Sequence, residues 1–311
     1  MKILFMGTPD FALFSLKGLC ENGYDVIGVV TQPDKPKGRG YVLTPPPVKV
    51  YATEKNIPVY QPNSLRTEEF ASLLSELNPD LIAVVAYGKI LPKNVLDYPK
   101  YGCVNVHGSL LPEYRGAAPM QMAIIDGKKV TGITTMFMAE GLDTGDMLLK
   151  TECPIEENDN FEIIHDRLGM LGAELLRKTI DGLGRGEITP IPQDHSKATH
   201  TSKILKEDCE INFSKDCDTV HNLIRGLSPI PLSFTHTPDG KLLKVVETEI
   251  CERESVNEEI GKVISLENGK IRVLCANGSI NILKVLPEGK GKMSSADFIR
   301  GRKINEGDIL K

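Results

Sequence analysis

Short apolar runs alternate with helical segments along the first half of the chain, and this alternation limits the fold more than any other feature. The runs are rich in Val and Ile and end at turn residues; they cover residues 2–7, 25–31, 81–86 and 102–107. Helical spacing is found between them, at residues 11–19, 48–55, 68–77 and 92–96. Such alternation is typical of a mainly parallel sheet with helices on both faces. We therefore expect an α/β, Rossmann-like N-terminal domain.

The composition changes after a periodic helix expected at residues 161–183. Residues 184–200 are rich in Pro, Gly, Thr and Ser and indicate a linker. Five short strands separated by turn residues follow, at 231–237, 242–248, 261–266, 270–275 and 279–285. They predict a small OB-like β-barrel, followed by a helix capped at Ser294. We divide the chain into a domain at 1–189, a linker at 190–206 and a barrel at 207–311.

Charge and cysteine content exclude several classes of protein. The chain has 37 Lys and Arg against 42 Asp and Glu, a net charge of −5, so it is not a globally basic nucleic-acid binder. Its 7 cysteines are odd in number and contain no C-x-x-C, which argues against a disulfide framework or a thiolate zinc site. The N-terminus fits neither a signal peptide nor a membrane span, so we expect a soluble, cytoplasmic protein.

A dinucleotide site would need G-x-G-x-x-G after the first strand. That position has one glycine, Gly7, followed by Thr8 and Pro9, and the proline removes a backbone donor. The sequence therefore argues against NAD binding.

The strand at residues 103–107 carries polar side chains where a central strand is normally apolar. Cys103, Asn105 and His107 share one face because side chains alternate along a strand. The amide and the imidazole need hydrogen-bond partners when buried, so they form either part of a site or a polar pair satisfied by the next loop. Cys103 can be read as a nucleophile, but it lies farther down the strand, and a buried inert thiol is the favoured interpretation.

An acidic, glycine-rich loop ends the strand expected at residues 132–138. Asp143 and Asp146 in this loop are each compatible with a simple turn cap. Together with Asn105 and His107, Asp143 completes a set of an amide, an imidazole and a carboxylate. This set favours a catalytic site.

Residues 105–112, 115–119 and 142–146 resemble the corresponding motifs of the folate-dependent formyltransferases. Other segments are similar to the branch of this family that acts on methionyl initiator tRNA, and extend the resemblance over almost the whole chain: residues 6–11, 31–40, 85–88, 224–227 and 293–298.

The resemblance implies transfer of a formyl group from 10-formyltetrahydrofolate to the α-amine of methionine on initiator tRNA. The Asn105 amide and a nitrogen of His107 would stabilise the tetrahedral oxyanion. Asp143 would orient His107 or stabilise its charge and help move the proton. No covalent intermediate is needed. The 6 histidines form no H-x-H or H-E-x-x-H, so we expect no metal.

The same resemblance assigns the folate border to Ser109, Leu110, Leu111 and Pro112, with the pterin near residues 85–91 and 136–141. Ordinary loop packing is the alternative for Leu110 to Pro112.

The tRNA contacts rest on charge placement. Lys35, Lys37 and Arg39 lie in a Pro- and Gly-rich segment that we expect to be irregular, and Lys49 adds a further charge nearby. Residues 284–303 hold six Lys or Arg against two Asp or Glu, which is consistent with a phosphate-contacting patch. A solvated charged surface is the alternative for both segments. No obligate protein partner is evident, so we expect a monomer.

Three rival functions remain open at this stage. A formyltransferase for a small amine, such as a nucleotide sugar, would keep Asn105, His107 and Asp143 but need no basic tail. A non-catalytic RNA-binding protein would not depend on His107. A Cys103-dependent hydrolase would be inactivated by thiol alkylation.

Overall fold

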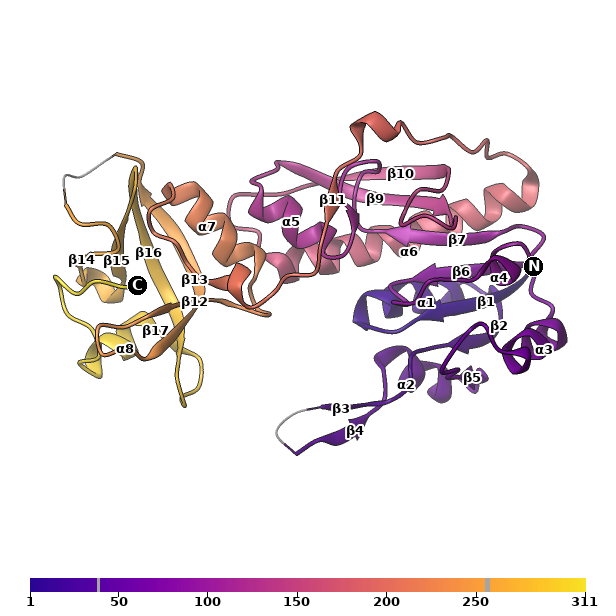
Figure 1. The fold of residues 1–311 in the computed structure, drawn as a ribbon, viewed down its shortest axis with the longest axis horizontal. Coiled ribbons are helices and arrows are strands. Elements are labelled where there is room, and N and C mark those ends of the chain that lie inside the picture. The colour runs from indigo at the N-terminus through magenta and orange to yellow at the C-terminus, as the bar shows by residue number, and fades with distance from the viewer. Residues whose placement is uncertain (38–39, 255–257) are drawn as a thin grey trace. The chain divides into compact units, whose positions relative to one another are not determined.

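The computed structural model describes residues 1–37, 40–254 and 258–311, and these form two compact units (Figure 1). The first unit comprises Met1–Gly116, Thr131–Cys153 and His165–His200. The second comprises Ala117–Val130, Pro154–Ile164 and Thr201–Lys311. None of the described helices combines the length and apolar character needed to cross a membrane.

A seven-stranded sheet in the order β10-β9-β7-β6-β1-β2-β5 forms the centre of the first unit. Its strands are β1 (Lys2–Gly7), β2 (Asp25–Val30), β5 (Val59–Tyr60), β6 (Leu81–Val85), β7 (Cys103–His107), β9 (Val130–Phe137) and β10 (Met147–Pro154). The pairs β1/β2, β1/β6, β2/β5 and β6/β7 are parallel, and β9 runs antiparallel to β7. The mainly parallel α/β sheet predicted from the sequence is therefore confirmed.

The predicted helices of this half are also present. They are α1 (Asp10–Glu21), α2 (Pro47–Glu54), α3 (Glu68–Leu77), α4 (Lys93–Leu96) and the long α6 (Phe161–Arg185). Local chemistry fixes their ends: the Thr67 hydroxyl accepts from the backbone N–H of Phe70 at the start of α3, and Asn78 ends it at φ 45°. The sequence did not predict α5 (Pro119–Ile125), nor the two-residue strands β8 (Arg115–Gly116) and β11 (His200–Thr201).

The segment expected to be irregular is a β-hairpin, so that prediction was wrong. Strand β3 (Lys35–Lys37) pairs antiparallel with β4 (Val42–Thr44), and Pro36 lies opposite Leu43. A proline is tolerated in an edge strand because its missing N–H can face away from the partner strand. A two-stranded ribbon consists only of edge strands, so Pro36 does not prevent pairing.

The second unit is built on an antiparallel sheet in the order β12-β13-β16-β15-β14. Its strands are β12 (Ser233–His236), β13 (Leu242–Glu252), β14 (Val263–Ser265), β15 (Ile271–Cys275) and β16 (Gly278–Pro287), with the short β17 (Met293–Ser294) paired to β16. All five predicted strands are present.

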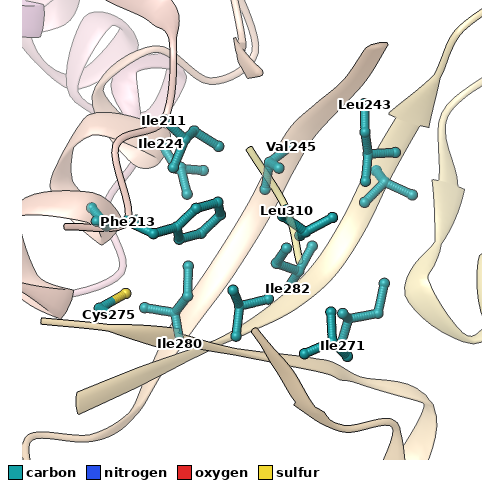
Figure 2. Close-up of a cluster of buried hydrophobic side chains, with 14 of the residues drawn as sticks. Ile211, Phe213, Ile224, Leu243, Val245, Ile271, Cys275, Ile280, Ile282 and Leu310 are labelled. Atoms are coloured by element: carbon teal, nitrogen blue, oxygen red, sulfur yellow. The ribbon is translucent and has the colours of Figure 1, made fainter. Parts of the chain in front are cut away.

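Residues 308–311 join the two edges of this sheet. Lys311 exchanges two backbone hydrogen bonds with His236 on β12. On the other side, the N–H of Val263 donates to Asp308, and the N–H of Leu310 donates to Gly261. The C-terminal segment therefore closes the sheet into a barrel, and Leu310 packs inside it with Val245 and Ile282 (Figure 2).

Two helices complete the barrel. Helix α7 (Cys217–Gly226) was not predicted; Asp216 caps its first turn, and Cys217, Val220 and Ile224 join the barrel core. Helix α8 (Ser295–Arg300) begins where the sequence predicted, because the Ser294 hydroxyl accepts from the N–H of Asp297 at 3.1 Å.

Candidate active site

The loops that follow three parallel strands are tied together at one edge of the first sheet. The Gln32 amide, after β2, donates to the carbonyl of Tyr87, after β6, at 2.9 Å. The hydroxyl of Thr8, after β1, donates to the same carbonyl at 3.3 Å. Ligands of α/β sheets bind at this carboxyl edge. The strand β7 ends at the same edge with His107, because it runs parallel to β6.

His107 is buried, and its two ring nitrogens have different surroundings. Nε2 lies 2.9 Å from the carbonyl oxygen of Tyr114, which only accepts, so Nε2 carries a proton. Nδ1 lies 3.7 Å from Oδ2 of Asp143. The structure therefore brings the predicted imidazole and carboxylate together, and leaves Nδ1 as the nitrogen available for chemistry.

The Asp143 carboxylate is held by a backbone donor that the sequence did not reveal. The N–H of Gly116 donates to Oδ2 at 2.8 Å. Asp143 itself lies in the left-handed region, at φ 51°. The loop passes so close to the end of β9 that a Cβ on Gly145 would lie 1.8 Å from the carbonyl oxygen of Phe137, so only glycine fits there.

Asn105 lies on the same face of β7 as His107. Its side chain is 9% exposed, and within the described part of the chain its amide makes no hydrogen bond. A largely buried amide without a partner is uncommon in folded proteins. Its donors are therefore available to a bound substrate.

Cys103, the third residue on this face, is an inert thiol. It is 2% exposed, and its Sγ lies 3.5 Å from the carbonyl oxygen of Val95. Burial raises the pKa of the thiol to about 12, which opposes formation of the nucleophilic thiolate. The prediction of a buried thiol is confirmed.

The loop after β7 is anchored by the neighbouring strands. Thr134 on β9 donates to the carbonyl of Ser109 at 2.8 Å and accepts from the N–H of Leu111 at 3.1 Å, while the Lys150 ammonium on β10 donates to the carbonyl of Leu111. Ser109 donates to the carbonyl of Glu113, and Leu111 packs against Met136 and Met147. The side chains of Ser109 and Leu111 are therefore buried, whereas Leu110 and Pro112 are partly exposed.

Gln193 is a site residue that the sequence did not indicate. It is buried, and its amide nitrogen donates to the carbonyls of Asp143 at 2.8 Å and Gly145 at 2.7 Å. Its amide oxygen accepts from Nη2 of Arg115 at 2.7 Å. A single glutamine in a Pro-rich segment expected to be a linker carries no local signal of such contacts.

The basic side chains assigned to tRNA have varied surroundings. Lys35 is exposed and donates to Gln32. Lys49 forms an ion pair with Asp34 at 2.8 Å, and this lysine holds the pKa of the Asp34 carboxyl below its usual value. Lys37 belongs to β3, and Arg39 lies outside the described residues.

No cluster of three or more His, Cys, Asp or Glu that could hold a metal occurs in residues 1–37, 40–254 and 258–311.

Comparison with known proteins identifies the class. Residues 1–180 match the formyl transferase family and residues 203–303 match the formyl transferase C-terminal domain, so the chain belongs to the formyl transferase family. The predicted family is therefore confirmed.

Its relatives specify the branch. The methionyl-tRNA formyltransferase of Acetivibrio thermocellus is 47% identical over 310 residues, covering 100% of this chain and 99% of the relative. That of Caldanaerobacter subterraneus subsp. tengcongensis is 49% identical over 312 residues and covers 100% of both chains.

Solved structures share the fold at lower identity. An N-formyltransferase from Helicobacter canadensis, crystallised with folinic acid and dTDP-3-aminofucose, superposes with a TM-score of 0.68 at 19% identity, covering 91% of this chain and 98% of that one. A sugar N-formyltransferase from Shewanella sp. FDAARGOS_354 gives a TM-score of 0.62 at 19% identity, covering 81% and 99%.

Proposed function

We propose that this enzyme transfers the formyl group of 10-formyltetrahydrofolate to the α-amine of methionyl initiator tRNA. Full-length likeness to methionyl-tRNA formyltransferases supports the acceptor. The observation that carries the chemistry is the position of His107 Nδ1 opposite the Asp143 carboxylate. The same strand presents the amide of Asn105, which makes no hydrogen bond to any described residue.

The first step is attack of the neutral amine on the formyl carbon. An α-amine has a reference pKa of about 7.7–8.0, so a substantial neutral fraction exists near pH 7. As the new C–N bond forms, the C=O electron pair moves to the formyl oxygen. The Asn105 amide then donates a hydrogen bond to this oxyanion, in a largely dry environment where such a bond is strong.

The second step breaks the bond between the formyl carbon and N10 of the folate. The amine loses a proton and N10 gains one, so the overall reaction neither consumes nor releases a proton. The His107–Asp143 pair carries this proton, because Nε2 is held by Tyr114 and Nδ1 faces the carboxylate. The carboxylate stabilises the positive charge that the ring gains when Nδ1 is protonated.

The anchored loop at Ser109, Leu110, Leu111 and Pro112 would border the folate. Because Ser109 and Leu111 are buried and their backbone groups are bonded to Thr134 and Lys150, these two residues would support the folate border from beneath. The partly exposed Leu110 and Pro112 would supply apolar contact with the pterin. Positioning of both substrates at this edge would contribute much of the rate.

Two surfaces would bind the tRNA. Beyond Lys35 and Lys37, the β3–β4 hairpin carries Tyr41 at 81% exposure and Val42 and Leu43 at 66% and 67%, and exposed apolar side chains of this kind mark interaction sites. Arg39 would add a phosphate contact. On the barrel, four basic side chains are exposed, and none has an ion pair within the described residues: Lys290, Lys292, Arg302 and Lys303.

We propose that residues 1–189 form the catalytic part, 190–206 the linker and 207–311 the RNA-binding part.

Single-turnover transfer from labelled 10-formyltetrahydrofolate tests the proposal with three acceptors: methionyl initiator tRNA, methionyl elongator tRNA and a dTDP-amino sugar. Transfer confined to the initiator tRNA is the expected result. Transfer only to the amino sugar would keep the chemistry and overturn the acceptor. No transfer to any of the three would overturn the proposed function.

A further inference from the structure

Gln193 reaches the active site because its segment pairs with β10. Ile191 exchanges two backbone hydrogen bonds with Met147, at 2.9 and 2.8 Å, at the first residue of that strand. Two residues later, the Gln193 side chain lies 3.9 Å from the sulfur of Met136 on β9 and is 5% exposed. A segment without regular structure therefore places a buried amide beneath the loop that carries Asp143.

Both N–H bonds of the Gln193 amide are used on this loop. They donate to the carbonyl oxygens of Asp143 and Gly145, which lie on either side of Thr144. Asp143 has φ 51°, a backbone conformation that is unfavourable for a residue with a Cβ. Fixing the carbonyl groups of residues 143 and 145 holds this conformation, and with it the direction of the Asp143 Cα–Cβ bond.

The oxygen of the same amide binds Arg115. Nε and Nη2 of Arg115 donate to it at 3.0 and 2.7 Å, and Nη2 also lies 3.1 Å from Nδ1 of His195. The next residue, Gly116, donates its N–H to the Asp143 carboxylate. A continuous set of hydrogen bonds through Gln193, Arg115 and Gly116 therefore connects the backbone of Asp143 with its own carboxylate.

We propose that Gln193 is a positioning residue for formyl transfer: it holds Asp143 so that the carboxylate faces Nδ1 of His107. This inference rests on the proposed function, because it assigns Gln193 to the proton step of that reaction. Gln193 touches no substrate and acts only through Asp143. Only one orientation of the amide satisfies both partners, with nitrogen toward the two carbonyls and oxygen toward the guanidinium.

This polarity suggests the variant that separates positioning from folding. Gln193→Glu keeps an acceptor for Arg115 and adds an opposite charge, so the guanidinium stays paired. It also places an oxygen next to the carbonyl oxygens of Asp143 and Gly145. The two hydrogen bonds that hold the loop are therefore lost. Gln193→Ala removes both the amide nitrogen and the amide oxygen. It leaves the guanidinium without this acceptor, so it is the more disruptive variant.

Steady-state formyl transfer to methionyl initiator tRNA, measured across pH at saturating folate, tests the role of Gln193. We expect Gln193→Glu to lower kcat by roughly 10- to 100-fold, the scale of a small misplacement of a reacting group, while KM for the tRNA stays within about twofold. The pH profile should change on the same limb as in Asp143→Asn. In the Asp143→Asn background, Gln193→Glu should lower kcat by less than about twofold, because the group that it positions is already lost.

Thr179→Val is the matched control. It deletes a fully buried hydroxyl of the same unit that lies 2.8 Å from the Thr135 hydroxyl, and it should leave the pH profile unchanged and combine additively with Asp143→Asn. Additive losses for Gln193→Glu, or an unchanged pH profile, would overturn the positioning role. A wild-type protein that transfers no formyl group would instead overturn the proposed function, and that result is obtained before any variant is compared.

Discussion

Each unit buries a histidine, and the two histidines are used differently. His221 in the second unit has both nitrogens occupied: Nε2 donates to the carbonyl of Glu157 at 3.3 Å, and Nδ1 accepts from the Thr248 hydroxyl at 2.9 Å. His107 in the first unit has only Nε2 occupied by a carbonyl, and its Nδ1 faces a carboxylate across 3.7 Å. The contacts of His221 fit a structural role, whereas Nδ1 of His107 is placed for the proton transfer proposed above.

The same contrast applies to the amides. Asn105 makes no hydrogen bond within the described residues, whereas the Gln193 amide uses its oxygen and both N–H bonds. The unused hydrogen-bonding capacity of the Asn105 amide therefore fits its proposed contact with substrate, and the saturated amide of Gln193 fits a supporting role. The following predictions test this difference between the two regions.

The largest effect is expected at the proposed reaction centre. Asn105→Ala and His107→Ala should each lose about 3 kcal/mol of transition-state stabilisation, comparable to removal of an oxyanion-hole donor. The measurement is kcat/KM for formyl transfer. Cys103→Ala is the control, since this thiol lies on the same strand face and takes no part in the chemistry; it should keep the wild-type kcat. Wild-type turnover in either of the first two variants would remove the catalytic assignment.

A stability effect is expected at His221. His221→Leu leaves the Thr248 hydroxyl and the Glu157 carbonyl without this partner, and should lower the free energy of unfolding by about 1–3 kcal/mol. Urea denaturation measures it. Activity per folded molecule should be unchanged, in contrast to His107. The control is His200→Leu at an exposed position, which should change stability by less than about 0.5 kcal/mol.

The pH dependence of stability should follow the His221 pKa, which burial lowers below its usual value. Above the unfolded-state pKa of about 6.5, both states are neutral and His221 carries no penalty. As the pH falls from there toward the lowered folded-state pKa, the unfolded state binds a proton that the folded state does not, and stability drops by up to about 1.4 kcal/mol per pH unit. The difference between wild type and His221→Leu isolates this slope.

His165 changes the pH dependence of stability in the opposite direction, so the effect of His221 is isolated only by comparing wild type with His221→Leu. The Asp10 carboxylate raises the pKa of His165, so its contribution is present at low pH and is lost as the pH rises through the folded-state pKa. Asp10 is largely exposed, so the contribution is small. Equal slopes for wild type and His221→Leu below pH 6.5 would contradict the assignment of the acid-side loss to His221.

The smallest effect is expected at Tyr87, whose buried hydroxyl has no hydrogen-bond partner among the residues that the structure describes. Tyr87→Phe removes an unsatisfied polar group and keeps the ring, so the free energy of unfolding should stay the same or rise by up to about 1 kcal/mol. Thermal denaturation measures it. Marked destabilisation would show that the hydroxyl has a partner in solution. Tyr24→Phe is the contrasting control, because the Tyr24 hydroxyl donates to Asp181 at 2.8 Å.

Sequence patterns predicted the features that depend on local chemistry. Alternation along β7 placed Asn105 and His107 on one face. Helical spacing predicted residues 68–77 without error, and in the structure Thr67 and Asn78 cap the two ends of this helix. The hairpin at β3 and β4 was missed because prolines normally argue against strands.

The remaining site contacts could not be predicted from the sequence. The backbone N–H of Gly116 has no residue-type signature, and Gln193 meets Asp143 only after the chain has folded, 50 residues apart.

The closure of the barrel by residues 308–311 means that one four-residue segment covers both edge strands of the sheet. Deletion of residues 308–311 would free the backbone groups of His236, Gly261 and Val263 and expose two strand edges at once. Open edges pair with other molecules. Loss of residues 308–311 would therefore favour association of copies of the protein through these edges.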